Sequence, residues 1–301
     1  MRQVTRTAAT PTTWSTLGLG ILAASSSGPL MAAIVAPALA IAFWRNALAS
    51  VVLTPITLVR LGRDRSARPA RRTLIGCLAA GVLLAAHFGS WVPSVTMTSV
   101  ATATALVSTQ PVWTALFAVL AGERFSKQFW IGVFLALIGV VLMTGADLSG
   151  SGPALAGDGL ALVGAVLVAG YFTIGSEVRR STSTTTYTAV CYGTCALVLL
   201  GVCLVGGARL GGYPAHSWLL LVGVTVGPQF LGHSLLNRVL SALSATTVSV
   251  ASLLQVPAAA LLAWVFLGQV PALLALPGMA VLLVGLGLVV LGSRTTVELE
   301  A

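Results

Sequence analysis

The chain has 301 residues, of which 57% are apolar and only 8% are charged, and its mean hydropathy is +0.98. A soluble domain would carry about 25% charged residues, so this composition excludes a soluble globular fold and indicates a surface that faces lipid. The net charge of +9 does not indicate nucleic-acid binding, because the basic residues lie between apolar segments and not on one face of a polar domain.

Ten apolar segments follow one another along the chain, each about as long as the 20 or so residues that a membrane-spanning helix needs. They are predicted at residues 14–34, 36–59, 73–93, 98–121, 128–146, 156–176, 184–206, 216–237, 242–267 and 272–292. Their continuous, non-alternating apolar character predicts helices and not the strands of a barrel. The sequence therefore predicts an all-α integral membrane protein with ten transmembrane helices and short tails at 1–13 and 294–301.

The basic residues predict the orientation of these helices, because cytoplasmic connections are enriched in arginine and lysine. With the N-terminus in the cytoplasm, 14 of the 16 basic residues fall on the cytoplasmic side. The exceptions are Arg209, on the outer side, and Arg45, within a segment. We therefore expect a multi-pass protein of the cytoplasmic membrane with both termini, and both tails, in the cytoplasm.

The chain repeats itself at a spacing of 146 residues without a gap. The recurring pairs are Gly18/Gly164, Gly81/Gly227, His87/His233, Pro111/Pro257, Gly122/Gly268, Gly132/Gly278 and Gly139/Gly285. Each half, 14–147 and 156–293, contains five predicted helices, and this odd number turns the second half upside down relative to the first. Two inverted five-helix repeats are typical of secondary transporters with alternating access.

The fourth and fifth segments carry a recognisable motif, Pro111…Gly122-Glu123-Arg124-Phe125-Ser126-Lys127-Gln128-Phe129-Trp130-Ile131-Gly132, followed by Gly139. Together with Arg45 and the five-plus-five layout, it resembles the EamA family of the drug/metabolite transporter superfamily over nearly the whole chain. The resemblance implies an exporter or exchanger of small metabolites, often amino acids or related compounds. It also implies a central cavity lined by the first four helices of each half, with the fifth and tenth helices peripheral. The chain departs from the repeat at Gln269, which stands where the first half has Glu123.

Arg45 is the only arginine deep within an apolar segment, where a charged side chain costs roughly 2.5–3.5 kcal/mol on insertion scales. One interpretation is that it attaches a substrate carboxylate or forms part of a gate. The other is a structural cation that bonds helix-end carbonyls or reaches the outer interface past Trp44. The sequence leaves both open.

His87 and His233 stand at matched positions of the two repeats and are predicted to line the substrate cavity. Histidine there would hydrogen-bond substrate or carry a proton, with a packing role as the alternative. His87 shares a helix face with Trp91, and His233 shares one with Gln229 and Asn237, each four residues away. Such polar stripes on apolar helices face protein or a water-filled cavity.

Pro111 and Pro257 are predicted to bend the fourth and ninth helices, because proline removes a backbone donor and clashes with the preceding turn. We interpret them as hinges beside the cavity, with ordinary kinks as the alternative. Tyr171 matches Ser25, which begins a polar break in the first segment. The predicted cavity residues are Arg45, His87, Trp91, Gln110, Trp113, Tyr171, Gln229, His233, Asn237 and Gln255.

These features predict a secondary transporter with a small-molecule substrate, surrounded by the lipid bilayer, that needs no cofactor or metal. The sequence contains no Walker-type phosphate loop. Efflux of lipophilic cations by the same fold is the alternative, which the tryptophans favour and Arg45 opposes. A membrane-embedded enzyme fits less well, because the sequence has no HExxH, no GxSxG and no pair of carboxylates deep in a segment. The glycines of the fifth and tenth helices are spaced for close packing, either within the chain or in a homodimer.

Overall fold

The computed structural model of the chain describes residues 10–64, 68–98, 100–144, 152–268 and 275–298, and all regular secondary structure in these ranges is helical. The elements are α1 Pro11–Ser25, α2 Ser27–Ala32, α3 Ala38–Arg63, α4 Arg71–Met97, α5 Val100–Val107, α6 Gln110–Leu120, α7 Lys127–Thr144, α8 Gly152–Val178, α9 Thr184–Val205, α10 Ala215–Val224, the π-helix η2 Thr225–His233, α11 Ser234–Val239, α12 Ala245–Ala251, the 3₁₀ turn η3 Ser252–Leu254, α13 Gln255–Leu267 and α14 Ala275–Glu298. The outer parts of the two predicted tails and Gln269 lie outside the described residues.

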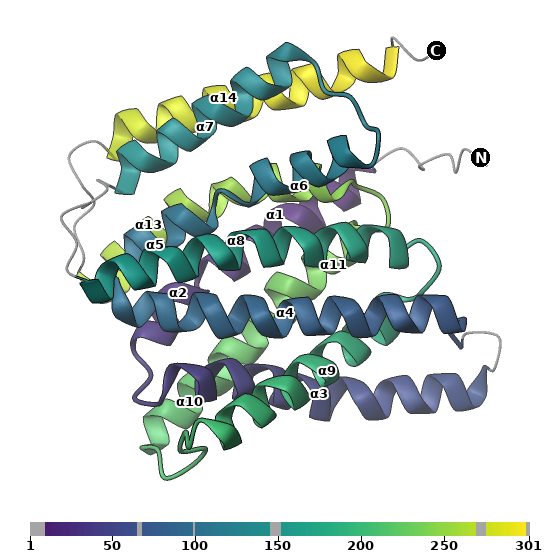
Figure 1. Cartoon of the computed structure of the whole chain (residues 1–301), viewed down its shortest axis with the longest axis vertical. Coiled ribbons are helices and arrows are strands. Elements are labelled where there is room, and N and C mark those ends of the chain that lie inside the picture. The colour runs from purple at the N-terminus through teal and green to yellow at the C-terminus, as the bar shows by residue number, and fades with distance from the viewer. Residues whose placement is uncertain (1–9, 65–67, 99, 145–151, 269–274, 299–301) are drawn as a thin grey trace.

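Several of these elements continue one another, so the described residues form ten successive helical units (Figure 1). The composite units are α1–α2, α5–α6, α10–η2–α11 and α12–η3–α13. Each unit overlaps one of the ten segments predicted from the sequence. Six stretches of the described chain are long and apolar enough to cross a membrane, namely Ala38–Arg63, Arg71–Met97, Gly152–Val178, Thr184–Val205, Ala215–Val239 and Ala245–Phe266. Shorter apolar helices are Gln110–Leu120, Lys127–Leu142 and Leu276–Val289.

Helices at equivalent positions of the two repeats pack against each other in antiparallel directions. The indole of Trp44, near the start of α3, donates to Leu210 O beyond the end of α9, at 2.9 Å. At the other end of the pair, the Thr57 hydroxyl donates to Thr185 O at the start of α9. The helix pair α7–α14 is antiparallel in the same way, and an antiparallel pairing of equivalent helices is what an inverted repeat requires.

A second packing arrangement between helices of the two repeats occurs at two places in the structure. In the first instance α4 lies along α8, and in the second α1 lies along η2 and α11. Small residues permit both contacts: a Cβ on Gly164 would lie 3.3 Å from Trp91 Cβ, and one on Gly232 would lie 3.0 Å from the Ala24 backbone. The repeat found in the sequence is therefore also a repeat in the packing.

The paired glycines Gly122 and Gly268 follow equivalent helices, α6 and α13. Both have positive φ values, 95° and 65°, in the region that is costly for residues with a Cβ. Their recurrence in the sequence is thus explained by a tight helix-ending turn that both repeats use.

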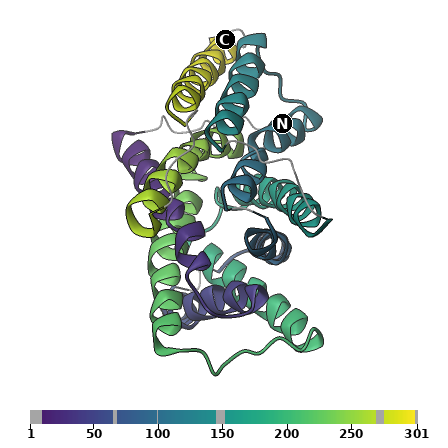
Figure 2. The ribbon, with the colours of Figure 1, turned by 90° about the vertical axis from the view of Figure 1, so that its left-hand side faces the viewer.

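The helices α7 and α14 lie side by side at one edge of the molecule (Figures 1 and 2), where buried side chains of this pair pack against α6, α12 and α13. Their glycines interlock: a Cβ on Gly132 would lie 2.7 Å from Gly285 O, and one on Gly292 would lie 2.7 Å from Phe129 N. The peripheral position agrees with the expectation for the fifth and tenth helices. The glycine face, which the sequence assigned either to internal packing or to a homodimer, is occupied by internal packing.

Candidate substrate cavity

A cavity of about 80 Å³, measured as the space open to the centres of water molecules, lies where the interrupted helices meet. A single water needs about 10–15 Å³ by this measure, so the cavity has room for several. Both repeats contribute polar side chains to its lining, including Ser25, His87 and Gln110 from the first and His233, Ser249 and Gln255 from the second.

The interruption between α1 and α2 follows from the local sequence. The hydroxyls of Ser25 and Ser26 donate to Ile21 O and Ala23 O at 2.7 and 2.8 Å, so they compete for carbonyls of the last turn of α1. Pro29 cannot donate a backbone hydrogen bond to the turn before it. The break lies beside the cavity, which Ser25 and Ser27 line, and helix breaks at membrane depth occur only at such protected positions.

The two predicted hinge prolines lie next to further interruptions. Pro111 is the second residue of α6, after the break that separates this helix from α5. Pro257 lies in α13, three residues beyond the 3₁₀ turn η3. The two sites are equivalent under the repeat, and Gln110 and Gln255, which begin these helices, both line the cavity.

The π-helix η2 is the fourth interruption, and it carries His233 at its end. Ser234 N donates to Gln229 O five residues earlier, the spacing that defines a π turn. Pro228 lies within this segment and cannot donate, which favours a local departure from α-helical hydrogen bonding. The wider turn places Gln229 fully inside the protein.

The two histidines line the same cavity but have different partners. His87 Nδ1 lies 2.9 Å from Gly164 O, so this nitrogen carries the proton and Nε2 is left as an acceptor. His233 Nδ1 is buried and has no hydrogen-bond partner among the described residues. Phe88 contacts both rings, with centroid distances of 5.0 Å to His87 and 5.4 Å to His233.

Arg45 is completely buried and is held mainly by neutral groups. Its Nε donates to Gln229 Oε1 at 2.8 Å, and its Nη1 donates to Ser27 Oγ at 3.1 Å. Its guanidinium carbon lies 4.2 Å from the centre of the Phe88 ring, a cation–π contact. Gln229 Nε2 donates in turn to Asn46 Oδ1 at 3.0 Å. Because Arg45 is completely buried, it does not reach the outer interface, and it does not line the cavity, whereas its partner Ser27 does.

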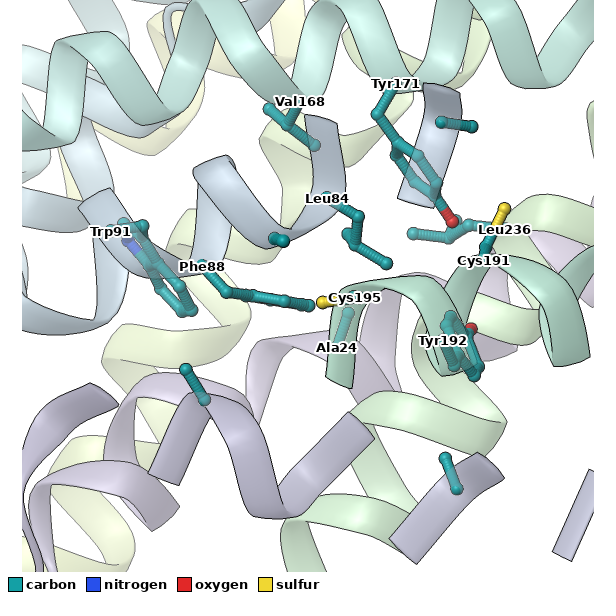
Figure 3. Packing of buried hydrophobic residues seen from close by; sticks show 14 of the residues in the cluster. Ala24, Leu84, Phe88, Trp91, Val168, Tyr171, Cys191, Tyr192, Cys195 and Leu236 are labelled. Atoms are coloured by element: carbon teal, nitrogen blue, oxygen red, sulfur yellow. The ribbon is translucent and has the colours of Figure 1, made fainter. Parts of the chain in front are cut away.

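Tyr171 and Asn237 form a second buried group behind the cavity wall. Tyr171 OH donates to Asn237 Oδ1 at 2.7 Å, and Tyr192 OH lies 3.0 Å from Ser234 Oγ. Figure 3 shows Tyr171 and Tyr192 within the packed interior, and Phe88 pointing toward Cys195. These tyrosines join α8, α9 and α11 of the second repeat.

The structure thus divides the ten predicted cavity residues into two sets. Those that line the cavity are His87, Trp91, Gln110, His233 and Gln255. Those that lie outside its lining are Arg45, Trp113, Tyr171, Gln229 and Asn237. Trp113 is half-buried, and its indole donates to Thr109 Oγ1 in the preceding turn.

Sequence reasoning missed Ser249 and Phe172, which both line the cavity. Ser249 lies one helical turn before Ser252, on the same face of the unit that contains Pro257, and this spacing is a signal that could have found it. Phe172 has no such signal, because an aromatic residue within an apolar helix is ordinary core.

The cytoplasmic end predicted for α8 contains three charged residues with different roles. Glu177 and Arg180 form an exposed ion pair at 2.8 Å. Arg179 turns inward instead: it donates to Asn237 O at 3.0 Å and to Thr184 Oγ1 at 2.7 Å. Burial lowers the pKa of Arg179 below its usual value. Arg179 therefore links the end of α8 to α9 and α11 through hydrogen bonds.

A helical bundle of two inverted repeats with a polar cavity between them defines a class of membrane transporters. The chain belongs to the EamA-like transporter family, whose model matches residues 13–145 and again 155–291. It is thus a multi-pass membrane transporter of the drug/metabolite transporter type, built from two family repeats.

Comparison with solved structures supports the fold, with 29 chains that match. One of them, described as "Crystal structure of protein", has a TM-score of 0.75 and 18% sequence identity, and the match covers 94% of this chain and 98% of that chain. No curated protein sequence matches this chain.

Proposed function

We propose that this chain is a secondary transporter that exports or exchanges small metabolites, amino acids or related compounds among them, across the cytoplasmic membrane by alternating access. The observation that carries the proposal is the cavity at the junction of interrupted helices from both repeats, with His87 and His233 at equivalent positions in its lining. Substrate sites of inverted-repeat transporters lie at such junctions, where broken helices offer unpaired backbone groups.

The proposed arrangement in the membrane has ten crossings with both termini in the cytoplasm. Helix ends that carry basic residues lie at one end of the bundle, on the right in Figure 1: the ends of α3 and α8 and the start of α4. The described N- and C-terminal residues lie at the same end. This grouping fits the enrichment of basic residues in cytoplasmic connections.

Alternating access would require the contacts that join the two repeats to break and re-form. The hydrogen bonds of Arg45 and Asn46 with Gln229 are contacts of this kind, because α3 belongs to the first repeat and η2 to the second. The interruptions near Pro111 and Pro257 would supply the hinges, since a helix bends most easily where its hydrogen bonds are already missing. In this mechanism His87 and His233 contact the solute, and the helices bend at the proline-containing segments.

Counterflow in proteoliposomes tests the proposal. Vesicles loaded with an unlabelled amino acid are diluted into the same labelled compound, and a transporter accumulates label transiently inside. We expect accumulation for at least one amino acid or related metabolite, with at least a severalfold reduction in His87→Ala and His233→Ala. Trp264→Phe, a change in an exposed side chain of α13, is the matched control. Absence of counterflow over a broad panel contradicts the proposal.

Efflux of lipophilic cations remains the second candidate, because aromatic side chains of Trp91 and Phe172 line the cavity and can stack on a cation. Cationic dyes therefore belong in the same counterflow panel. Accumulation of dyes without accumulation of metabolites would favour this second function.

A further inference from the structure

We propose that the cavity binds the carboxylate of its solute at a subsite made by Trp91, Ser249 and Ser27, with Arg45 supplying positive charge behind it. This inference rests on the proposed transport function and adds the chemical group that the site recognises. It predicts that a solute needs a carboxylate and that an amine without one is a poor ligand.

Two side chains that line the cavity each hold a buried donor that has no acceptor among the described residues. Trp91 Nε1 and Ser249 Oγ belong to side chains that line the cavity, and neither atom has a hydrogen-bond partner within the described residues. An indole N–H can only donate. A buried donor without an acceptor costs about 1–3 kcal/mol, so a ligand that brings acceptors is favoured at this position.

Ser27 offers a third donor and connects the subsite to a charge. Its hydroxyl oxygen accepts from Arg45 Nη1 at 3.1 Å, which leaves its own proton to donate. Ser27 lines the cavity, whereas Arg45 lies behind it. If a carboxylate accepts a hydrogen bond from Ser27, the Ser27 hydroxyl therefore bridges this carboxylate and the guanidinium of Arg45.

Within the described residues, no carboxylate pairs with Arg45. The acidic residues at described positions lie in connections or within about two turns of a helix end, namely Asp64, Glu123, Asp158, Glu177 and Glu298. Arg45 Nη2 is also without a hydrogen-bond partner in the part of the chain that the structure describes. An isolated positive charge in a water-poor interior costs several kcal/mol unless it is paired with a negative charge. A ligand with an anionic group would supply that negative charge, so its binding is favoured.

The same features oppose a cation. An ammonium group can only donate, so it satisfies neither Trp91 Nε1 nor Arg45, and Arg45 repels it. A neutral amide offers an acceptor but no charge. The subsite therefore ranks the three groups as carboxylate first, amide second and amine last.

The test uses matched compounds that differ only in this group: an amino acid, its carboxamide and the amine formed by its decarboxylation. Each competes against whichever labelled solute shows counterflow with the full-length protein in proteoliposomes. We expect the acid to compete roughly tenfold or more better than the amide, as charge-assisted hydrogen bonds predict, and the amine to compete least. Equal competition by the amide or the amine overturns the inference.

Variants of the two unpaired donors locate the subsite. Trp91→Phe keeps an aromatic ring and removes the N–H, and Ser249→Ala removes only the hydroxyl. We expect each to reduce the preference for acid over amide severalfold. The controls are Trp264→Phe, in an exposed side chain, and Ser50→Ala, which removes an unpaired buried hydroxyl outside the cavity lining. An unchanged preference in the Trp91→Phe/Ser249→Ala double variant overturns the inference.

Thermal unfolding in nanodiscs separates this inference from the proposed function, because a ligand that binds the folded state raises Tm without any transport. If no compound gives counterflow but only the acids raise Tm, the subsite stands and the transport proposal fails. If amides or amines exchange as well as acids do, transport stands and the subsite is wrong.

Discussion

Arg45 Nε donates a hydrogen bond of 2.8 Å to Gln229 Oε1, and this bond joins helix α3 of the first repeat to the π-helix of the second. Gln229 also donates to Asn46, so one amide satisfies two buried polar side chains of α3. Both partners are fully buried. The contact is therefore a polar link between the two halves in the state described here.

Replacement of Gln229 is expected to destabilise the protein. Gln229→Leu leaves Arg45 Nε and Asn46 Oδ1 buried without these partners, which should lower the free energy of unfolding by about 2–4 kcal/mol. Gln229→Glu keeps acceptor oxygens for Arg45 and should lose much less. Thermal unfolding of the three proteins in the same detergent measures the difference. A Gln229→Leu protein as stable as the wild type would show that the link contributes little.

The two equivalent histidines are expected to differ in their contribution to stability. His87 bonds Gly164 O and so ties α4 to α8, whereas His233 Nδ1 has no partner in the described ranges. His87→Ala should therefore lower stability by about 1 kcal/mol more than His233→Ala. Parallel denaturation curves give the comparison. Equal losses would mean that ring packing, and not the hydrogen bond, dominates at both positions.

Much of this fold is predictable from the sequence because its signals are local or strictly periodic. Segment length and continuous apolarity predict the helices, and the repeat of residues such as His87 and Pro111 predicts the two-part architecture. Proline at 111 and 257 indicates interruptions because its chemistry acts on the preceding turn. The π-helix has a weaker signal, a single proline at 228, and periodicity alone does not reveal it.

The division of polar residues between cavity and interior is not predictable from helix periodicity. A polar stripe indicates only that a face avoids lipid, and both a cavity and a buried neighbour meet that condition. Gln229 and Asn237 share a stripe with His233, yet only His233 lines the cavity. Gln229, the partner of Arg45 from the other repeat, lies 184 residues away in the sequence, so no local pattern identifies this contact.

The close packing of α7 and α14 makes a prediction about glycine. A Cβ on Gly139 would clash with Leu282 N, and one on Gly285 would clash with Ala136 N. Gly139→Ala and Gly285→Ala should each cost about 1–3 kcal/mol, because the two backbones must move apart. Gly287→Ala is the control on the same helix, since nothing lies within 4 Å of its Cβ position. Unfolding measurements that fail to separate Gly285→Ala from Gly287→Ala would contradict this packing.

The proposed membrane orientation is testable through cysteine labelling, because the chain's four cysteines are fully buried and should react slowly with a membrane-impermeant maleimide. Arg209 and Arg72 are both exposed, and they lie on opposite sides of the membrane in the proposed arrangement. Arg209→Cys should be labelled in intact cells, whereas Arg72→Cys should be labelled only after permeabilisation. The unsubstituted protein reports the background. Labelling of Arg72→Cys in intact cells would contradict the proposed orientation and would place this end of the bundle on the outer side of the membrane.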